Sequence, residues 1–314
     1  SAASDVYKRQ GVYNAGAALF RAQGNSKISM LSSLVMNVVN IGGNAILIYR
    51  FGMGVMGAAT ASLVSRMIAC FTVMFLLQKP DCALRIDQLT DLKPDLDLIK
   101  RILKVGIPAA LQMAVTAFSN VFVQSYINSF GEDCMGGWTA YVKIDQFLFL
   151  PMQSISLAVT TFVGQNLGIN QVARAKKGIR AGMLMAVACT ALLMVPVLIF
   201  APQLVEFFNK KREIVDYGSM LLRLISPFYV FCCINQIFAG ALRGAGNSRT
   251  PMFIMIGSFV VFRQIYLFIM ANYISNTIKP IALSYPAGWL LCSLITALYF
   301  KFAKWEKHRV VDIE

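Results

Sequence analysis

The chain is made of long apolar runs separated by short polar turns. Eight runs of about twenty residues are each long enough to cross the hydrocarbon core of a bilayer as an α-helix, and the end of a ninth lies at 11–20. Only 14% of the residues are charged, whereas about a quarter of a soluble protein is charged. We therefore expect an all-α, polytopic membrane protein with spans at 28–49, 54–77, 103–129, 138–166, 181–202, 218–241, 252–273 and 281–300.

One short polar motif occurs twice, each time between two apolar runs. It reads RAQGNSK at 21–27 and RGAGNSR at 243–249, so that Arg243 follows Arg21 by 222 residues. We interpret the chain as two homologous halves with this offset. Glycine permits a sharp reversal, asparagine tolerates a left-handed backbone and the flanking cations favour the cytoplasmic face, so we expect a structural hinge. Phosphate binding by this loop is the less favoured alternative, because no strand precedes it and no Walker pattern is present.

The formal net charge of +14 raises the question of nucleic-acid binding. If the loop after residue 78 lies in the cytoplasm, alternation of the spans places eighteen Lys and Arg residues on that side. Five lie on the other side, namely Arg50, Lys210, Lys211, Arg212 and Lys279. This bias satisfies the positive-inside rule, predicts a cytoplasmic C-terminus in a cell inner membrane, and leaves no reason to expect a nucleic-acid partner.

The seven cysteines form no CxxC pair, and the single histidine, His308, lies near the C-terminus. The spacing needed for a zinc site or a Cys/His hydrolase is therefore missing. We expect no metal, no cofactor and no enzymatic activity.

Asp145 is the one acidic residue inside a span, and an ionisable residue at that depth marks function by default. It belongs to a helix face of aromatic, acidic and thioether side chains that suits an apolar cation. Pro151 should bend this helix and free a carbonyl. The alternative is an ion pair with Lys143 or Arg263, with the aromatic rings as ordinary packing. The residues of the face, spaced three or four apart, are Trp138, Tyr141, Asp145, Phe149 and Met152.

Arg263 stands near the middle of a span and needs a carboxylate or a set of carbonyl oxygens. We favour a structural counter-ion over a substrate contact. Three other spans carry polar stripes, which offer oxygens to Na⁺ and hydrogen bonds to a substrate, or else join helices. Together the three favour a wet cavity. The stripes are Ser33, Asn37, Asn40 and Asn44; Gln112, Thr116, Ser119 and Asn120; and Ser226, Tyr229, Cys233, Gln236 and Gly240.

Several dispersed motifs in the right order resemble the multidrug and toxic compound extrusion family of secondary transporters. They are AGALRGAGN at 239–247, its counterpart from Tyr13-Asn14 to Asn25, Gly106-Ile107-Pro108, and VGQNLG at 163–168. The motif positions expected to be structural are Arg21, Gly24, Pro108, Pro151, Gly164, Gln165, Arg243, Gly244, Gly246 and Asn247.

This resemblance implies two pseudo-symmetric six-helix bundles around a central cavity, with the first bundle incomplete in this chain. Counting back from the second motif places the start of the first half about 120 residues before Ser1, which predicts an N-terminal truncation. Five segments are expected. Residues 1–10 are a non-native leader or junction, and residues 11–78 are the rest of the N-terminal lobe, with the end of span four and spans five and six. An inter-lobe linker with a surface helix follows at 79–100, then the C-terminal lobe with spans seven to twelve at 101–303 and a cytoplasmic tail at 304–314.

The resemblance also implies export of amphipathic, often cationic compounds in exchange for Na⁺ or H⁺, by alternating access, in a monomer within the lipid bilayer. Two family branches carry acidic cation sites, but the corresponding positions here are Thr116 with Cys233, and Asn44 after Asn40. The identity of the coupling ion therefore stays open. The alternatives are a flippase for lipid-linked oligosaccharides from the same superfamily, which should show several embedded cations, and a membrane enzyme or scaffold.

Overall fold

The computed structural model describes residues 2–78, 95–303 and 305–307. Two compact units divide the chain, Ser1–Asp95 and Leu96–Glu314, and we refer to them as unit 1 and unit 2. Every regular element in the described residues is a helix, which confirms the all-α class. Eight of them are long and apolar enough to span a membrane, as the hydropathy pattern predicts. They run over Ser26–Arg50, Gly54–Leu77, Leu96–Asn128, Glu132–Gly168, Val172–Ile199, Arg212–Gly244, Arg249–Ile274 and Ile278–Phe302.

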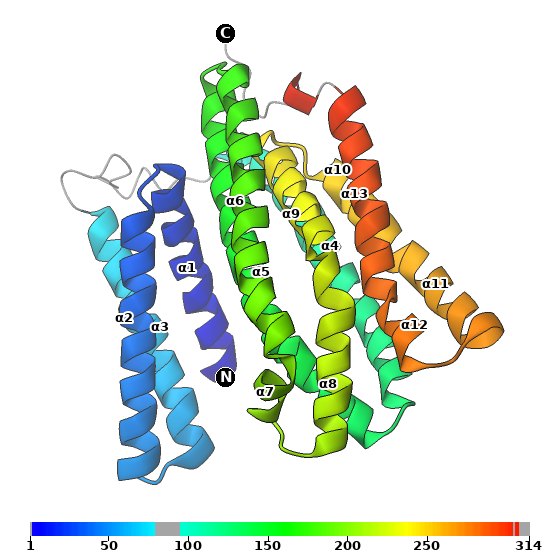
Figure 1. The fold of residues 1–314 in the computed structure, drawn as a ribbon. Helices are drawn as coiled ribbons and strands as arrows, with labels where there is room; N and C mark the ends of the chain where they lie inside the picture. Colours follow the sequence, from blue (N-terminus) through cyan, green and yellow to red (C-terminus); the bar gives the residue numbers. More distant parts are fainter. Residues whose placement is uncertain (1, 79–94, 304, 308–314) are drawn as a thin grey trace. The chain divides into compact units, whose positions relative to one another are not determined.

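Unit 1 consists of α1 (Ala2–Ala22), α2 (Ser26–Asn44) with the π-helix η1 (Ala45–Arg50), and α3 (Gly54–Leu77) (Figure 1). Its helices meet around the buried side chains of Phe20 and Val73. α1 runs through residue 10 without a break, so the boundary of the expected leader is not a helix end. The non-native origin of that segment stays a prediction.

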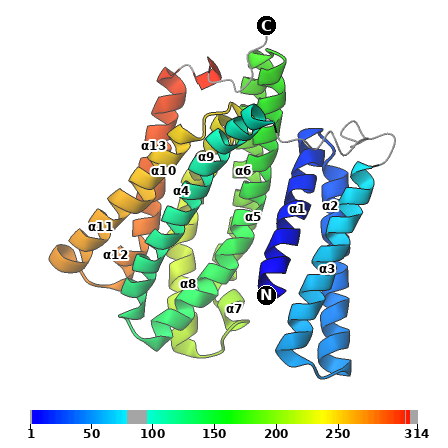
Figure 2. The ribbon, with the colours of Figure 1, turned by 180° about the vertical axis from the view of Figure 1, so that it is seen from behind.

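Unit 2 supplies six of the eight spans. Figure 2 shows α4 running beside α10 and α11. The elements in order are α4 (Leu96–Asn128), α5 (Glu132–Gly168), α6 (Val172–Ile199), α7 (Ala201–Glu206), α8 (Arg212–Ile225), η3 (Ser226–Phe228), α9 (Tyr229–Gly244), α10 (Arg249–Ile256), η4 (Gly257–Phe262), α11 (Arg263–Ile269), η5 (Met270–Ile274), α12 (Ile278–Ala282), α13 (Ser284–Phe302) and η6 (Trp305–Lys307).

Two expected polar segments fall partly outside this structure. The surface helix expected in the linker lies mostly within residues 79–94, which are outside the described residues. Residues 96–100, the last part of the expected linker, are helical and form the start of α4. The linker assignment stays a prediction. In the expected tail, Trp305 is buried and its ring lies 5.1 Å from that of Phe300.

Both copies of the duplicated motif adopt one backbone conformation. Gly24 has φ +82° and Gly246 has φ +83°, a region that glycine enters without steric cost. In each copy the amide of this glycine donates to the arginine carbonyl three residues earlier in the numbering, over 2.9 Å. The next amide donates to the carbonyl five residues back, also over 2.9 Å. The turn expected from the sequence is confirmed, but glycine rather than asparagine takes the left-handed conformation, since Asn25 has φ −93°.

A seam of small residues joins α5 to α9 and so fixes two walls of the candidate site described next. The Ser156 hydroxyl donates to the Gln236 carbonyl over 2.6 Å, and the Thr160 hydroxyl donates to the Gly240 carbonyl over 2.9 Å. Four residues further along each helix, a Cβ atom built on Gly164 would lie 3.3 Å from the Gly244 carbonyl oxygen. Positions four apart on each helix therefore pair in constant register, which allows the two backbones to approach closely.

Candidate functional site

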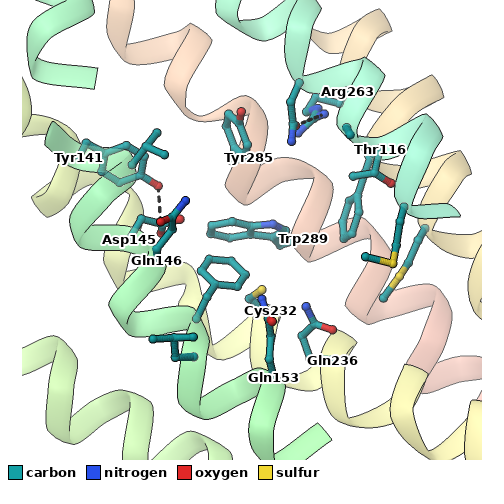
Figure 3. A pocket seen from close by; sticks show the side chains of 18 of the residues that line it. Thr116, Tyr141, Asp145, Gln146, Gln153, Cys232, Gln236, Arg263, Tyr285 and Trp289 are labelled. Atoms are coloured by element: carbon teal, nitrogen blue, oxygen red, sulfur yellow. Dashed lines mark hydrogen bonds between the residues drawn. The ribbon is translucent and has the colours of Figure 1, made fainter. Parts of the chain in front are cut away.

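A cavity of about 750 Å³ lies within unit 2, between α4, α5, α9, the α10–η4–α11 segment and α13 (Figure 3). Its walls are mainly aromatic and apolar, with a few polar groups pointing inward, as is typical of small-molecule sites. The aromatic lining comprises Trp138, Tyr141, Phe147, Phe149, Phe259, Tyr285 and Trp289. The polar lining comprises Gln112, Thr116, Asn120, Asp145, Gln146, Gln153, Gln236 and Arg263.

Asp145 faces this cavity from α5 and is held by two phenol groups. The hydroxyls of Tyr229 and Tyr141 both donate to its Oδ1 atom, the second over 3.4 Å. Within the described part of the chain, Oδ2 accepts no hydrogen bond and the carboxylate forms no ion pair. One carboxylate oxygen therefore remains available to a ligand.

The expected alternative for Asp145, an ion pair with Lys143 or Arg263, is wrong for the described structure. Lys143 lies over the ring of Phe208, 5.2 Å from its centroid, because its place on α5 turns it away from the cavity. Arg263 is held by groups on α4 instead. The aromatic residues around Asp145 nevertheless pack on one another; the rings of Phe149 and Tyr229 meet edge to face at 5.8 Å.

Arg263 faces the cavity from the start of α11, immediately after the π-helical segment Gly257–Phe262. Its Nη2 atom donates to Ser119 Oγ over 2.7 Å and to Asn120 Oδ1 over 2.8 Å. The guanidinium also lies over the ring of Tyr285, 4.8 Å from the centroid. All these partners are uncharged, so the counter-ion role expected for Arg263 finds no carboxylate among the described residues.

The two charges face the cavity from different sides. Figure 3 shows Asp145 beside Tyr141 on one side and Arg263 on the other, with Tyr285 and Trp289 between them. Each charge is stabilised separately by neutral hydrogen-bonding groups. The arrangement can therefore bind a cation at Asp145 against aromatic faces, which attract positive charge.

Most of the site residues expected from the sequence line this cavity, namely Gln112, Thr116, Asn120, Tyr141, Asp145, Phe149, Gln236 and Arg263. Met152 does not: it is fully buried in the core, because its neighbours on that side of α5 are other helices. Tyr229 is also fully buried and reaches the site only through its hydroxyl on Asp145. The expected functional roles of these residues stay predictions.

The stripe on the tenth-span equivalent mostly joins helices. Cys233 is buried against Thr190, with Sγ and Oγ1 3.2 Å apart, and Gly240 is covered by Ser156. Of this stripe, only Gln236 lines the cavity. The reason is geometric: in a helix surrounded by neighbours, polar residues on one face meet several different partners.

The asparagines of unit 1 form a small network on α2 and α3. Asn40 Nδ2 donates to Ser62 over 3.2 Å and to Ser65 over 3.4 Å, while Asn44 Nδ2 donates to Asn40 Oδ1 over 3.1 Å. Asn37 is exposed within this chain. Asn44 Oδ1 is buried without a partner in the described residues, so one carbonyl oxygen of the expected first-lobe cation site is unused.

Most of the motif residues shape the local fold of their own unit. Arg243 is the exception, since its Nη2 donates over 3.4 Å to Gln112 Oε1, and Gln112 in turn donates to Met255 Sδ over 2.7 Å. Pro108 and Pro151 lie inside α4 and α5, where each removes one backbone donor. The Oδ1 atom of Asn247 accepts a hydrogen bond from the Thr250 amide over 3.1 Å, and Arg21 donates one to the Ser29 hydroxyl over 2.8 Å. Gln165 is exposed.

Sequence reasoning missed the α13 wall and two glutamines of α5. Tyr285 and Trp289 are four residues apart, so both face the same side of α13. Gln146 and Gln153 are polar residues inside an apolar span, a signal as strong as the stripes that were considered. Cys232 also lines the cavity, and nothing in its local sequence separates it from Cys233.

Comparison with known proteins decides the family. The MatE family model matches residues 108–269, which is more than half of the chain and spans the cavity-forming helices from α4 to α11. The chain belongs to the MatE family. The resemblance inferred from the duplicated motif is thereby confirmed.

Curated relatives of this MatE chain are named as multidrug resistance proteins. It is 25% identical over 308 residues to the probable multidrug resistance protein YoeA of Bacillus subtilis, covering 96% of this chain and 66% of the relative. It is 26% identical over 302 residues to the probable multidrug resistance protein NorM of Thermotoga maritima, covering 95% and 64%. The chain thus spans about two thirds of the length of these relatives.

Solved structures of MATE transporters share its fold. An outward-facing multidrug resistance MATE family transporter of the MOP superfamily superposes with a TM-score of 0.87 at 22% identity, covering 94% of this chain and 66% of that one. A MATE crystal structure in the bent conformation gives a TM-score of 0.85 at 21% identity, again covering 94% and 66%. The polytopic, two-bundle MATE architecture expected from the sequence is therefore confirmed.

Proposed function

We propose that this MatE protein is an ion-coupled antiporter that exports amphipathic, cationic compounds by alternating access. The observation that carries the proposal is Asp145, a membrane-embedded carboxylate on the wall of an aromatic cavity. Its Oδ1 atom is held by Tyr229 and Tyr141. Embedded acids of this kind are costly to keep and mark ion or substrate pathways. The curated relatives that are named as multidrug resistance proteins support the transport of several compounds.

Coupling follows from the charge of one carboxylate in an apolar setting. A proton, a sodium ion or a cationic substrate each neutralises Asp145, and two of them at once would leave an uncompensated positive charge beside it in a low-dielectric cavity that already contains Arg263. Binding of the ion therefore opposes binding of the cationic substrate, which is what exchange requires. Aromatic rings such as those of Phe149 and Trp289 would contact the body of the substrate.

The arrangement of cations supports the proposed orientation. In unit 2, Arg174, Lys177 and Arg249 follow the turns that precede α6 and α10, at the same end as the C-terminal end of α13 (Figure 1). The opposite end carries Lys210, Lys211, Arg212 and Lys279, whereas the first end also carries Lys176, Arg180, Arg243 and Lys301. By the positive-inside rule the richer end lies in the cytoplasm, which gives a cytoplasmic C-terminus in a cell inner membrane. We propose that the protein acts there as a monomer in the bilayer, without a cofactor.

The competing flippase function requires recognition of a pyrophosphate, which calls for several cations. The cavity lining contains one, Arg263, together with one acid. A membrane enzyme would need a cluster of reactive groups at one depth. Within the described residues there is no group of three or more His, Cys, Asp or Glu that could hold a metal ion. Both alternatives are therefore less well supported than antiport.

The test is gradient-driven efflux from vesicles that contain the full-length protein, with a fluorescent organic cation inside. We expect efflux under an inward Na⁺ or H⁺ gradient, and its loss in Asp145→Asn. Asp133→Asn is a matched control, because Asp133 pairs with the exposed Lys211 over 2.5 Å, away from the cavity lining. Failure of both gradients to drive efflux would refute antiport, and unchanged efflux in Asp145→Asn would move the coupling site elsewhere.

A further inference from the structure

We propose that Arg263 forms an anion subsite that binds the carboxylate of a zwitterionic aromatic substrate, while Asp145 binds the cationic group of the same molecule. The inference rests on the proposed transport function for its biological use, and on the geometry of the cavity for its chemistry. It assigns a second recognition element to the cavity and narrows the substrate class from cations to molecules that carry both charges.

The first step is the unbalanced charge of Arg263. Its residue is 4% exposed, and the guanidinium forms no ion pair in the described part of the chain. Both hydrogen bonds to protein groups, to Ser119 and Asn120, come from Nη2. The Nε atom is buried and has no acceptor among the described residues, and no described acceptor forms a hydrogen bond with Nη1. A buried guanidinium with donors to spare is expensive unless an anion shares the site.

The second step is that the surrounding structure holds this guanidinium at the cavity wall. A π-helical segment, Gly257–Phe262, ends at Arg263, and such segments often occur at functional sites. The Tyr285 ring lies under the guanidinium plane at 4.8 Å, and Gln264 Nε2 fixes the same Ser119 hydroxyl over 2.9 Å. Arg263 therefore has a fixed orientation without a protein carboxylate, which is the arrangement expected of a preformed anion site.

The third step identifies the ligand. The Nη1 atom forms no hydrogen bond with the described residues, so its donors can form charge-assisted hydrogen bonds to a carboxylate, and one positive charge balances one negative charge. Asp145 supplies the opposite charge on the other side of the cavity, where its Oδ2 atom accepts no hydrogen bond from the described residues. Between the two charges lie the rings of Tyr285 and Trp289, 6.3 Å apart (Figure 3). A flat aromatic body with an amine or iminium at one end and a carboxylate at the other satisfies all three features.

The experiment compares two fluorescent probes that differ in one group. Rhodamine 110 carries a cationic ring system and a free carboxylate, whereas rhodamine 123 is its methyl ester and lacks the negative charge. Binding of each to the full-length protein in lipid nanodiscs is followed by fluorescence anisotropy at neutral pH with no ion gradient, and empty nanodiscs correct for partition into lipid. We expect the wild type to bind the acid at least about tenfold more tightly than the ester, since a charge-assisted hydrogen bond is worth at least that factor.

Four variants separate recognition from folding. Arg263→Gln should abolish the preference because it weakens binding of the acid alone. Arg263→Lys should keep part of the preference. Asn120→Asp leaves Arg263 in place but supplies an internal carboxylate at the Nη2 contact, so it should also remove the preference. Asp145→Asn should weaken the binding of both probes by the same factor.

Equal affinities of the wild type for the two probes would overturn the subsite, and so would an Arg263→Gln variant that weakens both probes equally. Because no gradient is used, the outcome is independent of antiport. A preference for the acid without gradient-driven efflux would keep the subsite and reject the proposed function. Gradient-driven efflux without a preference for the acid would support the proposed function and reject the subsite.

Discussion

The α5–α9 seam allows a stability prediction with a magnitude taken from the structure. A Cβ atom on Gly244 would lie 2.4 Å from the Thr160 carbonyl oxygen and 3.1 Å from Val163 Cβ. The nearest contact is backbone, so no side-chain rotation relieves it. Ordinary van der Waals contact begins about 1 Å farther out, so the two helices must separate locally by about that distance in Gly244→Ala.

That separation also weakens the hydrogen bonds along the seam. The Ser156–Gln236 and Thr160–Gly240 bonds, at 2.6 and 2.9 Å, would lengthen toward about 3.6 and 3.9 Å, beyond hydrogen-bonding range. Overpacking costs about 1–3 kcal/mol and each lost interhelical hydrogen bond in a membrane about 0.6 kcal/mol or more. We expect a loss of about 3 kcal/mol, or a fall in Tm of about 6–12 °C.

The assay is thermal unfolding of the purified full-length protein, followed by a dye that fluoresces on reacting with newly exposed thiols. Cys232, Cys233 and Cys292 are buried and report on unit 2. Gly106→Ala serves as the control, since a Cβ there meets nothing within 4 Å and alanine favours the helix. A Gly244→Ala midpoint equal to that of Gly106→Ala would refute the close approach of α5 and α9.

Two further predictions concern the carboxylate and the repeated turn. Tyr229→Phe removes the buried hydroxyl that holds Asp145. It should slow gradient-driven efflux more than Tyr141→Phe does, because the Tyr141 hydroxyl lies 3.4 Å from Oδ1 and binds it more weakly. Equal effects in the efflux assay would contradict this ordering. Gly246→Ala forces a side chain into φ +83° and should cost about 1–2 kcal/mol, visible as a lower Tm; an unchanged Tm would show that the turn tolerates L-residues.

The sequence predicts the spans and the turn well because both depend on local physical chemistry. Twenty apolar residues in a row have few alternatives to a helix across a bilayer, and the eight spans were found where hydropathy placed them. The duplicated motif predicts the same turn in both copies, and the backbone bonds of Gly24 and Gly246 match. The ends of the helices are less well predicted: α4 begins at Leu96, whereas the expected apolar span begins at residue 103, because charged residues lie between these two positions.

The candidate site was predicted only in part because periodicity gives the direction of a side chain but not what it meets. Met152 and Asp145 share a face of α5, yet Met152 is covered by other helices and Asp145 faces the cavity. Tyr229 was expected to line the cavity and instead supports Asp145 from behind. Trp289 contributes a central wall, but its span lies far along the chain from α5, and only the fold brings the two together.

The central claim is that the coupling ion and a cationic substrate compete for Asp145. Its most direct test is equilibrium binding of rhodamine 123 to the full-length protein in nanodiscs, titrated with Na⁺ and with H⁺ and measured by anisotropy. The account predicts that one of these ions weakens binding to the wild type competitively, and that Asp145→Asn binds the probe weakly with no response to either ion, while Asp133→Asn behaves as wild type. Undiminished competition in Asp145→Asn would contradict it.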